Sequence, residues 1–254
     1  MQPRSNIVHV IPMGLELDRV LGGLKEFPTN HVILLYGKDS SSGIEVKARH
    51  NGEKLRDLIS ATIDIEERMM DIFDFYSAAR SLKELFSDLR NRGFEVYVNI
   101  STGNRIITSA ALLAVFMTGS HPYYVQPERY SIPEGQEVLS HGVSSVMEIP
   151  SVTIVGPSRE DEQVLKVLGK LGGTARHETS LIPYLETVRG FFKPRKESES
   201  KRSYLARNRA HLSRTLRSLE KDGYVTLIKK GRYVNVSLTD TGLLFAGPPE
   251  NILS

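Results

Sequence analysis

The chain has 254 residues, 40% of them apolar and 25% charged, with 33 Lys and Arg residues against 30 Asp and Glu residues. This balance is typical of a globular protein with one large domain or two modest ones. The absence of cysteine excludes disulfide scaffolds, thiolate zinc sites, iron–sulfur clusters and cysteine nucleophiles. Neither a long apolar run nor a signal-peptide pattern is present, so we expect a cytoplasmic protein without membrane contact.

The small net charge of +3 conceals an asymmetry between the two halves. With a boundary at residues 156–158, the part from residue 159 onward holds 18 basic and 11 acidic side chains, whereas residues 1–158 hold 15 and 19. Between residues 189 and 232 the count is 14 basic against 4 acidic. This pattern indicates a nucleic-acid or membrane partner for the basic half, with a merely solubilising surface as the alternative. We expect one domain at residues 1–156 and a second at 157–254.

Strand-like and helix-like stretches alternate along the first half. The apolar patterns predict strands at residues 7–11, 31–36, 61–65, 94–100 and 123–126, and helices at 15–27, 44–60, 71–92 and 106–118. The second strand, HVILLY, is continuously apolar, as in a sheet that is covered on both faces. The alternation predicts an α/β fold with a Rossmann-like, doubly wound parallel sheet. Residues 131–155 match no expected element.

Three loops after these strands carry residues that suit an anionic ligand. In a doubly wound sheet, ligands lie beyond the carboxyl ends of the strands, where glycine permits close approach and helix N-termini offer free N–H groups. The alternative is that the hydroxyl residues only cap helices. Neither standard glycine-rich nucleotide motif, GxGxxG or GxxxxGK[ST], is present. The candidate ligand-binding residues are Met13, Gly14, Ser40, Ser41, Ser101, Thr102, Gly103, Asn104 and Arg105.

The loop VHVIPMGLELDR and the later motif NISTGNRIITSA resemble those of CARF domains, the Rossmann-like sensor domains of CRISPR-associated proteins. The resemblance covers roughly residues 6–130, with Asn104 and Arg105 where the family more often has Thr and Lys. It implies a homodimer whose paired sheets form one symmetric pocket for a cyclic oligoadenylate. Backbone N–H groups and Arg105 would meet its phosphates, and Met13 and Thr102 its riboses or bases. We expect no cofactor beyond this regulatory ligand.

The second half begins with helices expected at residues 159–171 and 179–189, a loop at 191–203 and a basic helix at 209–222. Strands at 224–229 and 233–238 flank a basic turn, and a last helix covers 239–246. The stretch HLSRTLRSLEKDGYVTLIKKGRYVNVSLTDTGLLFA resembles the recognition helix and wing of winged helix-turn-helix regulators. Residues 203–206 then belong to the supporting helix or its turn.

In this interpretation the basic helix enters the major groove of double-stranded DNA and the wing reaches phosphates or the minor groove. Arg214 and Arg217 are the main candidates for base contacts, because arginine pairs well with guanine. The alternative is a winged helix used only for protein contacts. The candidate DNA-binding residues are Arg209, Ser213, Arg214, Arg217, Lys229, Lys230 and Arg232.

These features favour a ligand-responsive transcriptional regulator of the archaeal CRISPR-associated type. Two alternatives stay open: a ring nuclease that cleaves the cyclic ligand with help from Ser40, Ser41, Arg105 or His9, and a sensor of another nucleotide or metabolite. We expect His9, His31 and His121 to be ordinary core or strand residues. No residue is assigned as catalytic, because no acid–base pair has convincing spacing, and no residue is assigned as a metal ligand.

Overall fold

The computed structural model describes residues 6–38, 43–131, 139–152, 154–231 and 233–247. The chain divides into two compact units, Met1–Val155 and Gly156–Ser254, and each is considered by itself. Within the described ranges, no helix combines the length and the apolar character that a membrane span requires. The candidate residues Ser40, Ser41 and Arg232 lie outside the described residues.

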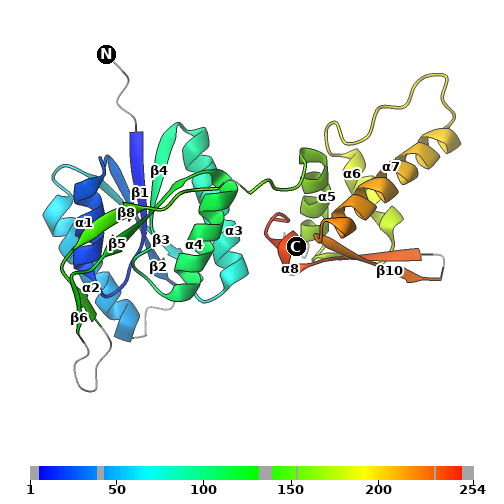
Figure 1. The fold of residues 1–254 in the computed structure, drawn as a ribbon. Helices are drawn as coiled ribbons and strands as arrows, with labels where there is room; N and C mark the ends of the chain where they lie inside the picture. The colour runs from blue at the N-terminus through cyan, green and yellow to red at the C-terminus, as the bar shows by residue number, and fades with distance from the viewer. Residues whose placement is uncertain (1–5, 39–42, 132–138, 153, 232, 248–254) are drawn as a thin grey trace, which may run out of the picture. The chain divides into compact units, whose positions relative to one another are not determined.

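A six-stranded sheet forms the centre of the N-terminal unit, in the order β3-β2-β1-β4-β5-β8 (Figure 1). Its first five strands are parallel, and β8 pairs antiparallel with β5 at one edge. The bounds are β1 Asn6–Pro12, β2 His31–Gly37, β3 Asp64–Met70, β4 Phe94–Asn99, β5 His121–Gln126 and β8 Ser145–Glu148. This arrangement confirms the predicted Rossmann-like, doubly wound sheet.

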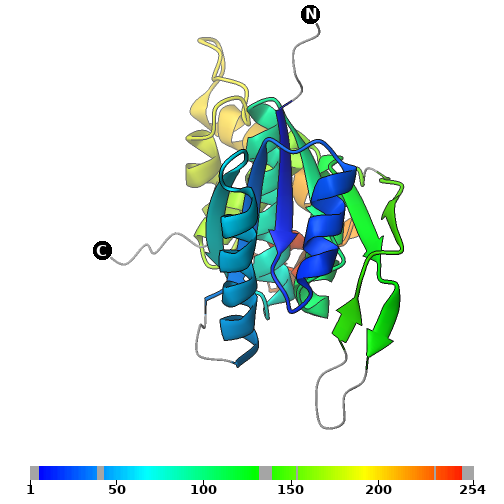
Figure 2. The same ribbon diagram turned by 90° about the vertical axis from the view of Figure 1, so that its left-hand side faces the viewer.

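Helices cover both faces of this sheet. Figure 1 shows α1 (Leu17–Glu26) and α2 (Gly43–Ile59) on one face and α3 (Phe75–Asn91) and α4 (Arg105–Thr118) on the other; Figure 2 looks onto the α1–α2 face. The central strands β1 and β2 are therefore apolar and almost entirely buried. The cover on both faces leaves the loops at the strand ends as the accessible part of the sheet.

Two sequence expectations in this unit are wrong. The third strand lies at β3 rather than at residues 61–65, because it is an edge strand whose polar sequence DIEERMM buries only Met70. The next helix begins at Phe75 rather than at residue 71, because Asp74 caps it by accepting from the N–H groups of Tyr76 and Ser77. The unassigned stretch 131–155 supplies β8 and, with residues before it, the small β6 (Arg129–Ser131) and β7 (Leu139–His141) pair.

The C-terminal unit packs helices against a three-stranded sheet of order β10-β11-β9. In chain order its elements are α5 Arg159–Lys170, β9 Thr174–Ala175, the 3-10 helix η1 Glu178–Leu181, α6 Ile182–Glu186, α7 Lys201–Lys221, β10 Val225–Lys230, β11 Tyr233–Leu238 and α8 Asp240–Leu243. Leu212, Leu216 and Leu219 of α7 are fully buried, as expected from their helical spacing.

Helix α7 is longer at its N-terminus than the sequence pattern predicts. It begins at Lys201, where Ser200 accepts from the N–H group of Ser203, so residues 203–206 belong to the basic helix and not to a supporting helix or turn. These first turns bury few apolar side chains, which is why hydrophobic periodicity does not reveal them. The helix expected at 179–189 is instead η1 followed by the short α6.

Candidate ligand site and nucleic-acid interface

The strand order of the N-terminal sheet places a switch point between β1 and β4. The chain runs outward from β1 to β2 and β3 on one side and from β4 to β5 on the other. Loops 13–16 and 100–104 leave the carboxyl ends of these two neighbouring strands. In open α/β sheets this is the crevice in which ligands bind.

Two glycines bring these loops into contact. A Cβ atom added to Gly14 would lie 2.7 Å from the backbone N of Gly103, and one added to Gly103 would lie 2.8 Å from Cβ of Pro12. Gly103 also has φ +86, a conformation that other residues rarely adopt. The close approach of the two loops therefore depends on the absence of side chains at these positions.

Ser101 and Thr102 are buried and use their hydroxyl groups within the protein. The Thr102 Oγ1 donates to the carbonyl of Pro12 at 2.7 Å, which ties the loop after β4 to the end of β1. The Ser101 Oγ accepts from Val125 N at 2.6 Å, which ties the same loop to β5. These two candidate residues therefore fix the loop after β4 through hydrogen bonds within the protein.

Asn104 and Arg105 occupy the start of α4. The Asn104 Oδ1 accepts from Ile106 N at 2.8 Å and from Ile107 N at 2.9 Å, so this side chain is the helix cap. Its Nδ2 donates to the carbonyl of Ile72 at 3.1 Å, which links the loop to the chain after β3. Arg105 follows as an exposed cation in the first turn of α4.

Met13 and Gly14 differ in what they offer. The Met13 side chain is buried in a core cluster that includes Ile11 and Val20, so it is not exposed to the crevice. The carbonyl of Gly14 accepts from Asn51 Nδ2 of α2 at 3.1 Å, and Asn51 also donates to the carbonyl of Leu15 at 2.9 Å. The backbone of this loop is thus fixed from the α2 side.

Arg19, a residue that the sequence analysis passed over, lies behind these loops. It is only 6% exposed, its Nε donates to the carbonyl of Val125 at 2.9 Å, and its guanidinium lies 4.8 Å from the centre of the Tyr124 ring. Its Nη2 has no hydrogen-bond partner among the described residues. A buried cation with a free donor adds positive charge beside the crevice. In the sequence, only the position of Arg19 in the motif LELDR points to a special role, because helical periodicity alone predicts an ordinary surface arginine there.

Asn99 connects Arg19 to the loop after β4. Its Nδ2 donates to the carbonyl of Arg19 at 3.2 Å, and its Oδ1 accepts from Ser101 N at 2.8 Å. The first turn of α1 and the loop after β4 are therefore joined by one fully buried side chain. Across the described ranges, no group of three or more His, Asp and Glu side chains is arranged to hold a metal ion.

His9 lies inside the sheet core. It is fully buried, packs against Tyr97 and Phe27, and its Nδ1 lies 3.1 Å from the Tyr123 hydroxyl. Burial lowers the pKa of His9 to about 4, although a hydrogen bond to the Pro28 carbonyl opposes this shift. His9 is thus a core histidine, as expected, and is not accessible to a ligand.

Helix α7 displays one basic stripe to solvent. Arg209, Ser213 and Arg217 are spaced four residues apart and so lie along one side of the helix, with both arginines exposed and Ser213 half-buried. Lys229 and Lys230 are exposed at the end of β10, where the hairpin turns at Gly231 with φ +61. Exposed cations on a helix and on a hairpin tip match the electrostatic pattern of DNA-binding winged helices.

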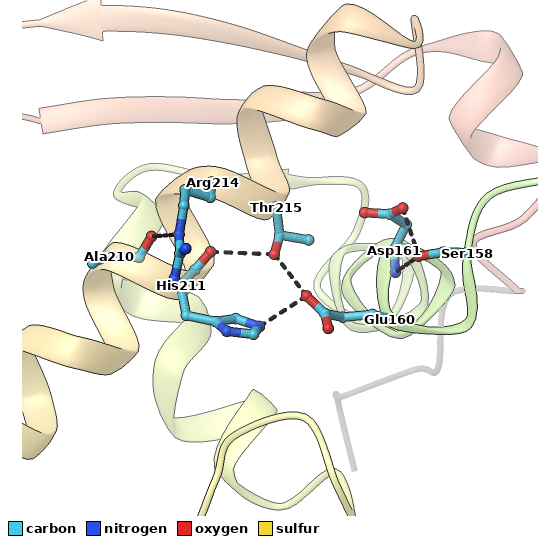
Figure 3. A network of polar contacts seen from close by, with 7 residues as sticks. All are labelled: Ser158, Glu160, Asp161, Ala210, His211, Arg214 and Thr215. Carbon is cyan, nitrogen blue, oxygen red and sulfur yellow. Dashed lines mark hydrogen bonds and ion pairs between the residues drawn. The ribbon is translucent and has the colours of Figure 1, made fainter.

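Arg214 is also exposed on α7. Figure 3 shows it beside a polar network that joins α7 to α5: Glu160 Oε1 is 2.8 Å from His211 Nε2 and accepts from Thr215 Oγ1 at 3.1 Å. The Arg214 Nε donates to the carbonyl of Ala210 at 3.2 Å. Arg214 therefore has a backbone contact on its own helix, whereas the structure gives Arg209 and Arg217 no such contact among the described residues.

Comparisons with known proteins agree with this division of the chain. Residues 7–130 match the family model described as "HFX_2341_N:-like, N-terminal", and residues 160–246 match the model of the DUF6293 C-terminal winged helix domain. The predicted organisation, a Rossmann-like sheet followed by a winged helix domain, is confirmed. An uncharacterized protein of Archaeoglobus fulgidus is 22% identical over 242 residues, which cover 94% of this chain and 97% of that protein.

Among solved structures, Can2 from Sulfobacillus thermosulfidooxidans in complex with cyclic tetra-adenylate is 13% identical, with a TM-score of 0.41 over 94% of this chain and 63% of that chain. Enterococcus italicus Csm6 bound to cyclic hexa-2'-fluoro-hexa-dAMP is 17% identical, with a TM-score of 0.39 over 52% of this chain and 36% of that chain. The chain thus spans less than two thirds of the length of these structures.

Proposed function

Because this chain carries an HFX_2341-like N-terminal domain and a DUF6293-type C-terminal winged helix domain, we propose that it is a ligand-responsive DNA-binding regulator. The observation that carries the proposal is that one chain joins two contacting glycine-containing loops at the β1/β4 switch point to a winged helix with exposed cations. The first feature suits an anionic ligand and the second suits duplex DNA.

The proposed ligand is a cyclic oligoadenylate. The resemblance of the two strand-end motifs to CARF domains supports this choice, and the geometry is compatible with it. A ring of phosphates would meet the backbone of the two loops that Gly14 and Gly103 hold together, and a cation at the rim, which Arg105 supplies. Asn104 would orient the rim, while Met13, Ser101 and Thr102 would support it from the core.

The proposed active species is a homodimer. A cyclic oligoadenylate with an even number of nucleotides has two-fold symmetry, so one ring can make the same contacts with each of the two identical subunits. Two winged helices in one dimer would read two half-sites of a palindromic operator. Ligand would act by favouring the dimer arrangement in which the two helices fit, or do not fit, these half-sites.

Titration calorimetry tests the sensing half of the proposal. We expect binding of cyclic tetra-adenylate or cyclic hexa-adenylate with one ring per two chains, and no comparable binding of the matching linear oligoadenylate. Product analysis by chromatography after long incubation separates a sensor, which returns the ring intact, from a ring nuclease. No observation favours the nuclease, since His9 is enclosed in the core and the described part of the crevice presents no acid–base pair. If no cyclic oligoadenylate binds, the proposed ligand is wrong, and a sensor of another nucleotide or metabolite is favoured instead.

A further inference from the structure

We propose that the segment between α6 and α7, residues 187–200, is a second DNA contact that holds the phosphate backbone beside the helix and wing. The inference rests on the proposed function, because it names how the same domain would bind duplex DNA. It concerns residues outside the candidate interface described above, and it assigns them a sequence-independent role.

Exposed cations without partners mark this surface. Lys193, Arg195 and Lys196 lie in the segment, and Lys201 and Arg202 follow in the first turn of α7. None of these side chains has an ion-pair partner among the described residues, and no large apolar side chain of residues 193–202 is exposed. Unpaired cations without an apolar surface suit a phosphate backbone better than a protein surface, since protein interfaces are built on aromatic and apolar anchors.

Arg207 fixes this segment to α7. Its Nη2 donates to the carbonyls of Lys193 at 2.9 Å and Pro194 at 3.3 Å, and the same atom lies 3.3 Å from Glu199 Oε2. The turn closes on itself where Glu199 N donates to the Lys196 carbonyl at 3.0 Å. A connection of this length usually varies in conformation, so Arg207 acts as a positioning residue that presents the cations in one place.

The position of the segment agrees with a shared DNA surface. Figure 1 shows the segment, the N-terminal end of α7 and the turn of the β10–β11 hairpin at the same end of the C-terminal unit, while α5 and α8 lie at the other end. The last residues of β10 and the first turn of α7 therefore lie toward the same end of this unit. A duplex placed there would meet cations from the segment, from the first turn of α7 and from the hairpin.

The experiment measures affinity of the full-length protein for a fluorescein-labelled mixed-sequence duplex across a salt series. The variant Arg195→Gln/Lys196→Gln is compared with Lys166→Gln/Lys170→Gln, which removes the same charge from α5 at the other end of the unit. We expect the loop variant to bind less tightly and the slope of log affinity against log salt to fall by about 1 to 2, as for one or two lost phosphate contacts. The α5 variant keeps the wild-type slope.

The outcomes separate the inference from the proposed function. If the wild type binds duplex DNA and both variants bind alike, the loop contact is refuted while the regulator proposal stands. If the wild type does not bind any duplex, both proposals fail. The variant Arg207→Met adds a second readout: we expect faster tryptic cleavage within residues 193–196 together with a lower salt slope. Unchanged cleavage and slope would remove Arg207 from its positioning role.

Discussion

Gly14 and Gly103 are in backbone contact at the switch point of the sheet: a Cβ on Gly14 would lie 2.7 Å from the Gly103 nitrogen. The two loops that the sequence motifs single out are therefore one surface. The ligand part of the proposed function depends on this contact, which Thr102 reinforces through its hydrogen bond to the Pro12 carbonyl.

Gly14→Ala should separate these loops, because the clash is with backbone and not with the end of a flexible side chain. We expect a loss of about 1–3 kcal/mol in the free energy of unfolding, measured with urea, and a loss of cyclic oligoadenylate binding. Gly43→Ala is the matched control, since a Cβ there meets nothing within 4 Å. Wild-type ligand affinity in Gly14→Ala would contradict the close-approach argument.

Arg105→Ala should weaken ligand binding without affecting stability, because the side chain is exposed at the rim. Loss of a charge-assisted contact of about 1.5–3 kcal/mol corresponds to roughly a tenfold to hundredfold increase in Kd. Arg105→Lys should recover part of this loss, and Lys54→Ala, an exposed cation on α2, should have no effect in the same calorimetric titration. Equal affinities for Arg105→Ala and Lys54→Ala would exclude Arg105 from the site.

Arg19→Met should show whether the buried guanidinium serves the ligand or the fold. The unpartnered Nη2 predicts that its charge is retained for an anion, so the variant should lose ligand affinity while its free energy of unfolding falls by no more than about 2 kcal/mol. Calorimetry and urea unfolding on the same preparation provide both values. A variant that unfolds far more easily yet binds the ligand as well as the wild type would make Arg19 purely structural.

Arg209→Ala and Arg217→Ala should each reduce DNA affinity more than Arg214→Ala, because the Arg214 Nε is engaged by the carbonyl of Ala210 on its own helix, whereas the other two arginines have no such contact among the described residues. A lost base contact is worth about 1–3 kcal/mol, and fluorescence anisotropy at fixed salt measures it. The original choice of Arg214 as a leading base contact would be supported instead if Arg214→Ala has the largest effect of the three.

His9 should make the stability of the N-terminal unit dependent on pH. Its pKa is about 4 in the folded protein against 6.5 for the free side chain, so the unfolded chain takes up a proton first as the pH falls. This contribution is complete above pH 6.5 and is lost as the pH falls toward 4, with about 2 kcal/mol lost between pH 7 and pH 5. Urea unfolding at both pH values should show a smaller difference for His9→Phe and a wild-type difference for His50→Gln, an exposed histidine.

Much of the fold could be predicted where apolar pattern and burial coincide. The runs that form β1, β2 and β4 and the leucines of α7 follow simple periodicity, so the order of elements and the winged helix were within reach of the sequence. The edge strand β3 and the first turns of α7 could not be predicted in this way. The residues of β3 are mostly polar, and the start of α7 is fixed by the hydrogen bond of Arg207 to the Lys193 carbonyl, so neither shows an apolar periodicity.

The contact between the two candidate loops could be predicted from the sequence, but the part that each side chain plays in it could not. Gly14, Gly103 and Arg105 lie together as the two motifs suggest, whereas Ser101 and Thr102 use their hydroxyls inside the protein. Arg19 was missed because its importance arises from burial against Val125 and Tyr124, which are more than a hundred residues away along the chain. Contacts of this kind depend on the strand order and leave no local trace.

The most direct test of the central claim is the affinity of the protein for its selected duplex, measured by anisotropy with and without saturating cyclic oligoadenylate. We expect the ligand to change the Kd for DNA at least severalfold, and DNA to change the Kd for the ligand by the same factor. In Arg105→Ala the same effect should require a roughly tenfold to hundredfold higher ligand concentration, while DNA binding without ligand stays at the wild-type level. A DNA affinity that is identical with bound and without bound ligand would contradict the claim that this chain is a ligand-responsive regulator.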